Sequence, residues 1–227
     1  MEKYAYFSGA LLFFLIWIFL FSKRKDLREE MVWAGFLGLP FGLIELFFVP
    51  NYWNPLSLFG LMERYGFGIE GFIYAFSIGG IAAVVYEFLE KRRVQKISRR
   101  HHLAAFCFFL AIFFTLELVF PGKPMLNLAA AFVGGSLWIA VARPDLIKQI
   151  LSSGAAFGIL YFLVLCFINF LFNDFVSIFY TPQIFNNFKF LGVPIEEILG
   201  AVAGGAFWSV LYEYALGYRD VRLRKKR

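Results

Sequence analysis

Two adjacent glutamates, Glu196 and Glu197, stand at the start of a hydrophobic run that continues to Leu216. A carboxylate at the mouth of an apolar membrane segment is costly, because it needs water, a partner or a proton. If several carboxylates lie close together in a low dielectric, at least one is expected to keep its proton near neutral pH. Such a group is suited to general acid catalysis, so the pair is the first candidate for chemistry.

The elements that must position this pair are hydrophobic helices. The chain is 60% apolar and contains 32 phenylalanines, and its apolar runs are long enough to cross a hydrocarbon core of roughly 30 Å. Helices are expected because a single spanning segment must satisfy its own backbone groups. The sequence thus predicts an all-α integral membrane protein with seven transmembrane helices, at residues 4–21, 31–49, 69–89, 102–120, 126–142, 152–172 and 195–216.

The basic residues predict the orientation. Eighteen of the 22 lysines and arginines fall in the tail and in the loops after the first, third and fifth spans, and four fall on the other side. The positive-inside rule therefore places the N-terminus outside and the C-terminus in the cytoplasm. The same loops account for the net charge of +6 through contact with anionic lipid headgroups, so nucleic acid is not an expected partner.

The chain also repeats itself at a shift of 126 residues. Residues 69–89 and 195–215 share seven identities without a gap, among them Glu70 with Glu196 and Glu87 with Glu213. This predicts a parallel tandem repeat: a first three-helix unit at 1–95, a linking helix at 96–122 and a second three-helix unit at 123–227. Small residues four apart, such as Ala75 and Gly79, predict close helix packing between the repeats.

Further carboxylates fall in the predicted outer half of the bundle. They are Glu45, Glu70, Glu117 and Asp174. If the helices close into one bundle, these groups can converge with Glu196 and Glu197. For Glu70 and the pair, a structural alternative is capping of the first helical turn. For Glu45 and Glu117 the alternative is a satisfied polar contact between helices. Glu87 and Glu213 are expected to snorkel or to pair with Arg92 and Arg219.

The segment Pro194-Ile-Glu196-Glu197 opens the last hydrophobic span, which ends Leu211-Tyr-Glu213. This pattern resembles the integral-membrane lycopene cyclase domain family, whose hallmark is a P-x-E-E motif at the start of a helix. In that family a unit of about three spans occurs twice in one chain or as two subunits. The 126-residue repeat fits the tandem form, so the resemblance covers nearly the whole chain.

The resemblance implies a redox-neutral, acid-catalysed cyclisation of lycopene that needs no cofactor and no metal. Protonation of the terminal double bond gives a tertiary cation, the neighbouring double bond attacks it, and loss of a ring proton gives a β-ring. The resemblance assigns Glu196 and Glu197 to the acidic motif, one as the proton donor, with a second carboxylate as acceptor. The implied substrate is a lipophilic polyene or another isoprenoid that enters from the bilayer.

The first repeat departs from the motif, with Gly68-Ile-Glu70-Gly71 at the corresponding place. Either the first half is structural, or Glu70 acts alone as a partner to the second site. Two other functions stay open: a small proton-coupled transporter built from parallel three-helix repeats, and a non-catalytic cyclase-like membrane subunit. Membrane lipids are expected partners in each case, and the sequence leaves the oligomeric state open.

Overall fold

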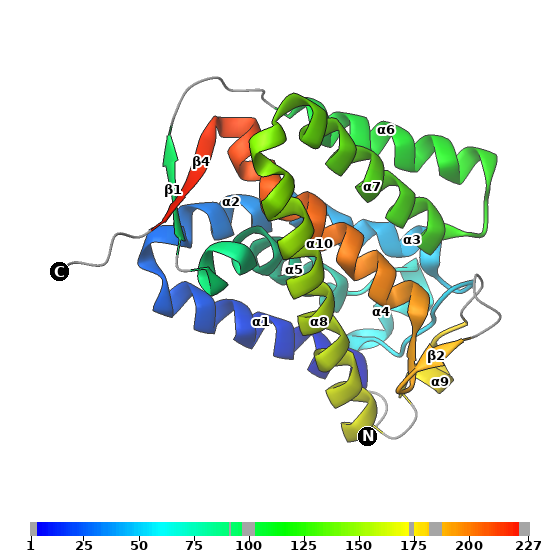
Figure 1. The fold of residues 1–227 in the computed structure, drawn as a ribbon. Coiled ribbons are helices and arrows are strands. Elements are labelled where there is room, and N and C mark those ends of the chain that lie inside the picture. Colours follow the sequence, from blue (N-terminus) through cyan, green and yellow to red (C-terminus); the bar gives the residue numbers. More distant parts are fainter. Residues whose placement is uncertain (1–3, 91, 97–102, 173–174, 182–187, 223–227) are drawn as a thin grey trace.

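The structure is a computed structural model that describes all residues except 1–3, 91, 97–102, 173–174, 182–187 and 223–227 (Figure 1). Nearly all of the described chain is helical. The α-helices are α1 (Ala5–Lys23), α2 (Arg28–Gly38), α3 (Glu45–Phe48), α4 (Leu61–Tyr65), α5 (Ile69–Leu89), α6 (Ala104–Val119), α7 (Pro124–Ala142), α8 (Ile147–Leu171), α9 (Phe175–Phe179) and α10 (Ile195–Leu216). Short 3₁₀ helices are η2 (Lys25–Leu27), η3 (Leu39–Ile44), η4 (Leu58–Gly60) and η5 (Pro144–Leu146).

Six helical segments of the described chain are long and apolar enough to cross a membrane. They are Ala5–Lys23, Lys25–Phe48, Ile69–Leu89, Pro124–Ala142, Pro144–Leu171 and Ile195–Leu216. Helix α6 is apolar but has only 16 residues, so it is shorter than the predicted fourth span at 102–120. Large apolar side chains such as Leu118, Val141 and Phe170 are more than four-fifths exposed on the outside of the bundle, as expected for surfaces that face lipid.

The order of elements recurs along the chain. The first half contains α1, the turn η2 and α2, with α5 later in the chain. The second half contains α7, the turn η5 and α8 in the same order, with α10 later in the chain. Both turns are built alike. Arg24 forms an ion pair with Asp26 and donates a hydrogen bond to the carbonyl of Glu87, and Arg143 does the same with Asp145 and the carbonyl of Glu213. Each turn thereby ties the start of one helix to the end of another.

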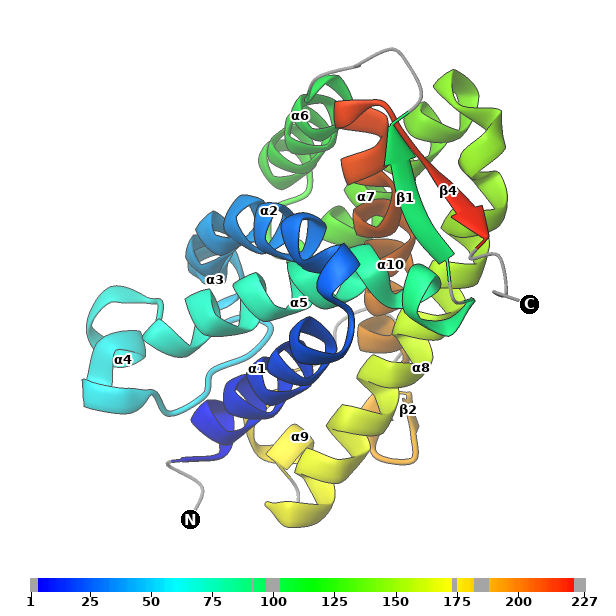
Figure 2. The same ribbon diagram turned by 90° about the vertical axis from the view of Figure 1, so that its left-hand side faces the viewer.

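The small residues of α5 and α10 allow close packing, although within each repeat rather than between repeats as predicted. Gly79 of α5 faces the backbone of Ala34 in α2, and Gly205 of α10 faces Phe157 in α8. The long helix pairs α2–α5 and α8–α10 are accordingly in extensive contact. Figure 2 shows α1, α2 and α5 gathered together, with α8 and α10 beside them.

Four short strands were not predicted from the sequence. Strand β1 (Arg92–Lys96) follows α5 and pairs antiparallel with β4 (Tyr218–Arg222), which follows α10. Strands β2 (Lys189–Phe190) and β3 (Val193–Pro194) form a small hairpin just before α10. The β1–β4 pair joins segments more than a hundred residues apart, so no local pattern could indicate it. It lies at the opposite end of the bundle from the β2–β3 hairpin (Figure 1).

The contact between α2 and α5 leaves no room for a side chain at Gly79. A Cβ atom there would lie 2.8 Å from the backbone oxygen of Ala34, so the helices would have to separate. We expect Gly79→Ala to lower the free energy of unfolding by about 1–3 kcal/mol. Unfolding in mixed detergent micelles, followed by circular dichroism, measures it.

Gly9→Ala is the matched control, because nothing lies within 4 Å of a Cβ atom at Gly9 of α1. It should leave stability unchanged or raise it slightly, since alanine favours a helix over glycine. Equal stability of the two variants would contradict the close α2–α5 packing.

Candidate active site

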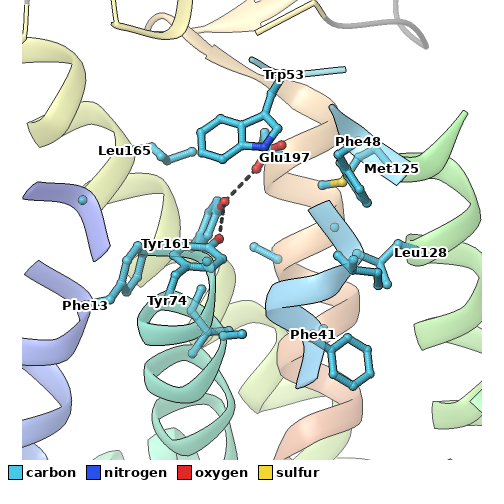
Figure 3. Close-up of a pocket in the computed structure, with 18 of the residues that line it drawn as sticks. Phe13, Phe41, Phe48, Trp53, Tyr74, Met125, Leu128, Tyr161, Leu165 and Glu197 are labelled. Carbon is cyan, nitrogen blue, oxygen red and sulfur yellow. Dashed lines mark hydrogen bonds between the residues drawn. The ribbon is translucent and has the colours of Figure 1, made fainter. Parts of the chain in front are cut away.

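An apolar cavity of about 220 Å³ lies inside the bundle (Figure 3). Its walls come from both halves of the chain: α1, η3, α3 and α5 from the first half, and α7, α8 and α10 from the second. Most lining side chains are aliphatic or aromatic, among them Phe13, Phe41, Phe132, Phe157, Leu165 and Trp208. The carboxylates in the lining are Glu45 and Glu197. The cavity is therefore an apolar chamber with two acidic groups.

Glu197, in the first turn of α10, is held by two phenol groups. Tyr52 donates a hydrogen bond to Oε1 at 2.8 Å and Tyr161 donates one to Oε2 at 2.7 Å. The residue is only 6% exposed. Hydrogen bonds to an ionised group contribute about 1.5–3 kcal/mol each, so both tyrosines stabilise the carboxylate that would remain after Glu197 released a proton.

The tyrosine donors are themselves fixed in place. Tyr74 of α5 donates to the hydroxyl of Tyr161 at 2.8 Å, which gives a chain of phenols running from the first repeat to Glu197 (Figure 3). Burial, together with the nearby charge of Glu197, raises the pKa of Tyr52 well above its ordinary value. Tyr52 therefore stays a neutral phenol and remains a donor throughout the physiological pH range.

Glu45 is the second carboxylate in the cavity wall. It begins α3, is 7% exposed, and accepts hydrogen bonds from the Tyr6 hydroxyl and, at 2.9 Å, from the backbone N–H of Gly68. Its partners come from α1 and from the residue before α5, so the carboxyl group connects three segments of the first half. The structure thus brings Glu45 and Glu197 to one cavity.

The other predicted site residues lie elsewhere. Glu70 and Glu196 are buried but do not line the cavity, and the Oε1 atom of Glu70 accepts a hydrogen bond from the N–H of Leu58 at 2.6 Å. Glu117 lies near the end of α6, outside the cavity, where it accepts a hydrogen bond from Asn127 of α7 at 2.9 Å. This is a polar contact between helices. Asp174 lies outside the described residues.

Sequence reasoning missed the tyrosines. Tyr52, Trp53 and Tyr180 lie in segments between the predicted spans, yet all three line the cavity, and Tyr52 is only 1% exposed. Tyr6 and Tyr161 are likewise buried inside long apolar helices. A tyrosine within an apolar span was the available signal, because its hydroxyl needs a hydrogen-bond partner when it is buried.

A second buried polar cluster lies at the other ends of α5 and α10. Glu87 and Glu213 are fully buried rather than snorkelling, and Gln149 of α8 donates to both carboxyl groups at 2.8 Å. The Gln149 Nε2 atom also lies 2.6 Å from the carbonyl oxygen of Ser209, so its two N–H bonds are shared among three acceptors. The side chains of Arg92 and Arg219, the predicted partners, lie outside the described part of the structure. The two repeats are thus linked here through one amide.

The fold and the site together define an α-helical membrane protein whose two related halves enclose an apolar, acid-bearing cavity. A sequence model of the lycopene cyclase family matches residues 3–89 and 123–215, which is most of the chain, in two tandem segments. The chain belongs to the lycopene cyclase family. The matched segments end with α5 and α10, and the residues between them include β1 and α6. No curated protein and no solved structure was found to match the chain.

The role of Gln149 can be tested without reference to activity. Gln149→Leu removes the donor shared by Glu87 and Glu213, so we expect the free energy of unfolding to fall by about 1.5–3 kcal/mol. Denaturation in detergent gives the value. Ser136→Ala serves as the control, because the buried Ser136 hydroxyl has no hydrogen-bond partner within the described structure. Equal stability of the two variants would argue against the shared amide.

Proposed function

We propose that this protein catalyses the redox-neutral, acid-catalysed cyclisation of the end group of a linear carotenoid, converting lycopene to a β-ring carotene. The observation that carries the proposal is the position of Glu197: a motif glutamate, buried in an apolar cavity and hydrogen-bonded by two tyrosines. Membership of the lycopene cyclase family gives independent support. The substrate is a lipophilic polyene that enters from the bilayer.

Glu197 acts as the general acid. It transfers a proton to the terminal double bond of the substrate, and the two phenol donors stabilise the carboxylate that it becomes. The positive charge then lies on carbon in a chamber whose mostly apolar walls offer few hydrogen-bonding groups to hold a water molecule that could trap it. The faces of aromatic rings attract cations by about 0.5–2 kcal/mol each. Phe13, Phe41, Tyr74, Tyr161 and Trp208 provide such rings in the cavity wall.

The composition of the cavity disfavours a transporter of polar solutes. Such a protein needs hydrogen-bonding groups from both repeats along its path. Apart from Glu45, Glu197 and aromatic groups, the cavity is lined by aliphatic residues, methionine and glycine. Several of the polar atoms are already engaged within the protein, as in the pairs Tyr6–Glu45 and Tyr74–Tyr161. An apolar substrate suits this chamber better.

The membrane arrangement that we propose has seven spans, with three helices on either side of α6. Helix α6 has 16 residues, about 24 Å at 1.5 Å per residue, and a bilayer adjusts to a short span by local thinning. The units are then residues 1–95, 96–122 and 123–227. The N-terminus is outside and the C-terminus cytoplasmic, which places Glu197 in the outer half of the membrane and Gln149 in the inner half.

Replacement of the proposed acid tests the function. In bacteria that accumulate lycopene, we expect the wild-type protein to produce cyclic carotene and Glu197→Gln to lower the yield at least a hundredfold, the usual lower limit for a general acid. Pigments are separated by chromatography, and the protein is quantified in the same membranes.

Glu196→Gln is the control, because Glu196 is buried next to the proposed acid but does not line the cavity. It should retain activity. Unchanged lycopene in membranes that contain folded wild-type protein would overturn the proposed function.

Loss of one hydrogen bond to Glu197 should slow the cyclisation without abolishing the product. Tyr161→Phe removes a donor worth about 1.5–3 kcal/mol, so we expect a rate about ten- to a hundredfold lower. Tyr74→Phe, one hydrogen bond further away, should have a smaller effect. Initial rates with lycopene in detergent or liposomes provide the comparison, and a larger loss for Tyr74→Phe would speak against this arrangement.

A further inference from the structure

The first turn of α5 lacks the glutamate that faces the cavity in α10. Glu197 is the third residue of α10, and the third residue of α5 is Gly71. Gly71 and Glu197 both line the cavity, whereas the preceding glutamates, Glu70 and Glu196, do not. Position 71 therefore faces the chamber from the first repeat as position 197 faces it from the second, but it carries no side chain.

The carboxyl group of Glu45 occupies the space that this side chain would need. A Cβ atom built on Gly71 would lie 2.7 Å from the carboxyl carbon of Glu45 and 2.7 and 2.8 Å from its two oxygens. No side chain can stand at residue 71 while Glu45 is in place. Each repeat thus presents a carboxylate at this position of the cavity wall. In the second repeat it is Glu197, the third residue of α10, and in the first repeat it is Glu45 of α3, which lies beside the third residue of α5.

We propose that Glu45 is a further catalytic residue, which accepts the ring proton and so determines where the ring double bond forms. This inference rests on the proposed function and completes its reaction. Glu197 breaks its O–H bond to form a C–H bond at the terminal alkene. The π electrons of the neighbouring double bond then form the ring C–C bond. The Glu45 carboxylate takes a proton from a ring carbon next to the cation, and the released C–H electron pair becomes the ring double bond.

This step is balanced without an oxidant or reductant. One proton leaves Glu197 and one arrives at Glu45, after which both groups re-equilibrate with solvent. Ring carbons on different sides of the cation give different double-bond positions, so the outcome depends on which C–H bond the base reaches. The carboxylate of Glu45 is held in one position, because Tyr6 and the N–H of Gly68 each donate to one of its oxygens. Those donors also stabilise the carboxylate that must accept the proton.

Deuterium labelling separates the donor from the acceptor. With lycopene and wild-type protein in D₂O, the product should carry one deuterium for each ring formed. Glu197→Gln should leave lycopene that is neither cyclised nor labelled. Glu45→Gln should form at least tenfold less ring product, while its recovered lycopene gains deuterium at the end groups, because protonation still occurs and reverses. Mass spectrometry of the separated carotenes reads each outcome. Glu117→Gln, which changes a carboxylate outside the cavity, should behave as wild type.

A swap of the carboxylate keeps the test independent of any loss of folding. Glu45→Ala should lose ring formation, and the double variant Glu45→Ala with Gly71→Glu should regain at least tenfold of it, because the first repeat then carries its glutamate where the second does. Glu45→Asp, which draws the carboxylate back, should change the proportion of ring double-bond isomers.

Wild-type yield from Glu45→Gln would overturn the inference and leave the proposed function standing. The inference would also be overturned if folded Glu45→Gln left its lycopene without deuterium, or if the folded double variant regained no ring formation. Absence of ring product from the wild-type protein would remove both.

Discussion

The structure depends on one constraint: a carboxyl group removed from water must be given hydrogen-bond donors by the protein around it. Each buried acid of the cavity meets this need from other parts of the chain. Glu197 of α10 is held by Tyr161 of α8 and by Tyr52. Glu45 of α3 is held by Tyr6 of α1 and by the backbone before α5. The acids thereby help to fix the arrangement of the helices that enclose them, so the groups proposed for chemistry also position their surroundings.

The two ends of the bundle use this constraint differently. At one end the acids line a chamber among aromatic rings, where room is left for an apolar molecule. At the other end Glu87, Glu213 and Gln149 are packed together, and the adjoining turns place Arg24 and Arg143 against the last carbonyls of α5 and α10. The duplicated sequence supplies both ends. One end forms the candidate site, and the other links the two halves through Gln149.

The sequence was sufficient for the helical membrane class and for the family, because long apolar runs and the Pro194-Ile-Glu196-Glu197 motif are local signals. It also indicated Glu45 and Glu197 as acids of interest, and the structure places both in one cavity. It could not separate them from Glu117, because depth along a helix does not specify which face a residue occupies. The remaining features are contacts between distant segments. They are the hydrogen bonds from the tyrosines, the Glu45 carboxyl group that fills the space beside Gly71, and the β1–β4 pairing. No periodicity within one segment reports such contacts.

The β1–β4 ribbon affects how a divided form of this architecture could hold together. It joins the segment after α5 to the segment after α10 by backbone pairing. Arg92 lies opposite Arg222 at one end of the ribbon, and Lys96 lies opposite Tyr218 at the other. If the polypeptide were separated between β1 and α6, one strand would remain with each fragment. The ladder would then be an intermolecular contact whose hydrogen bonds are made by backbone atoms. Each of the two fragments would then carry one strand of the pair as a contact for the other fragment, and this contact would lie outside the apolar helices.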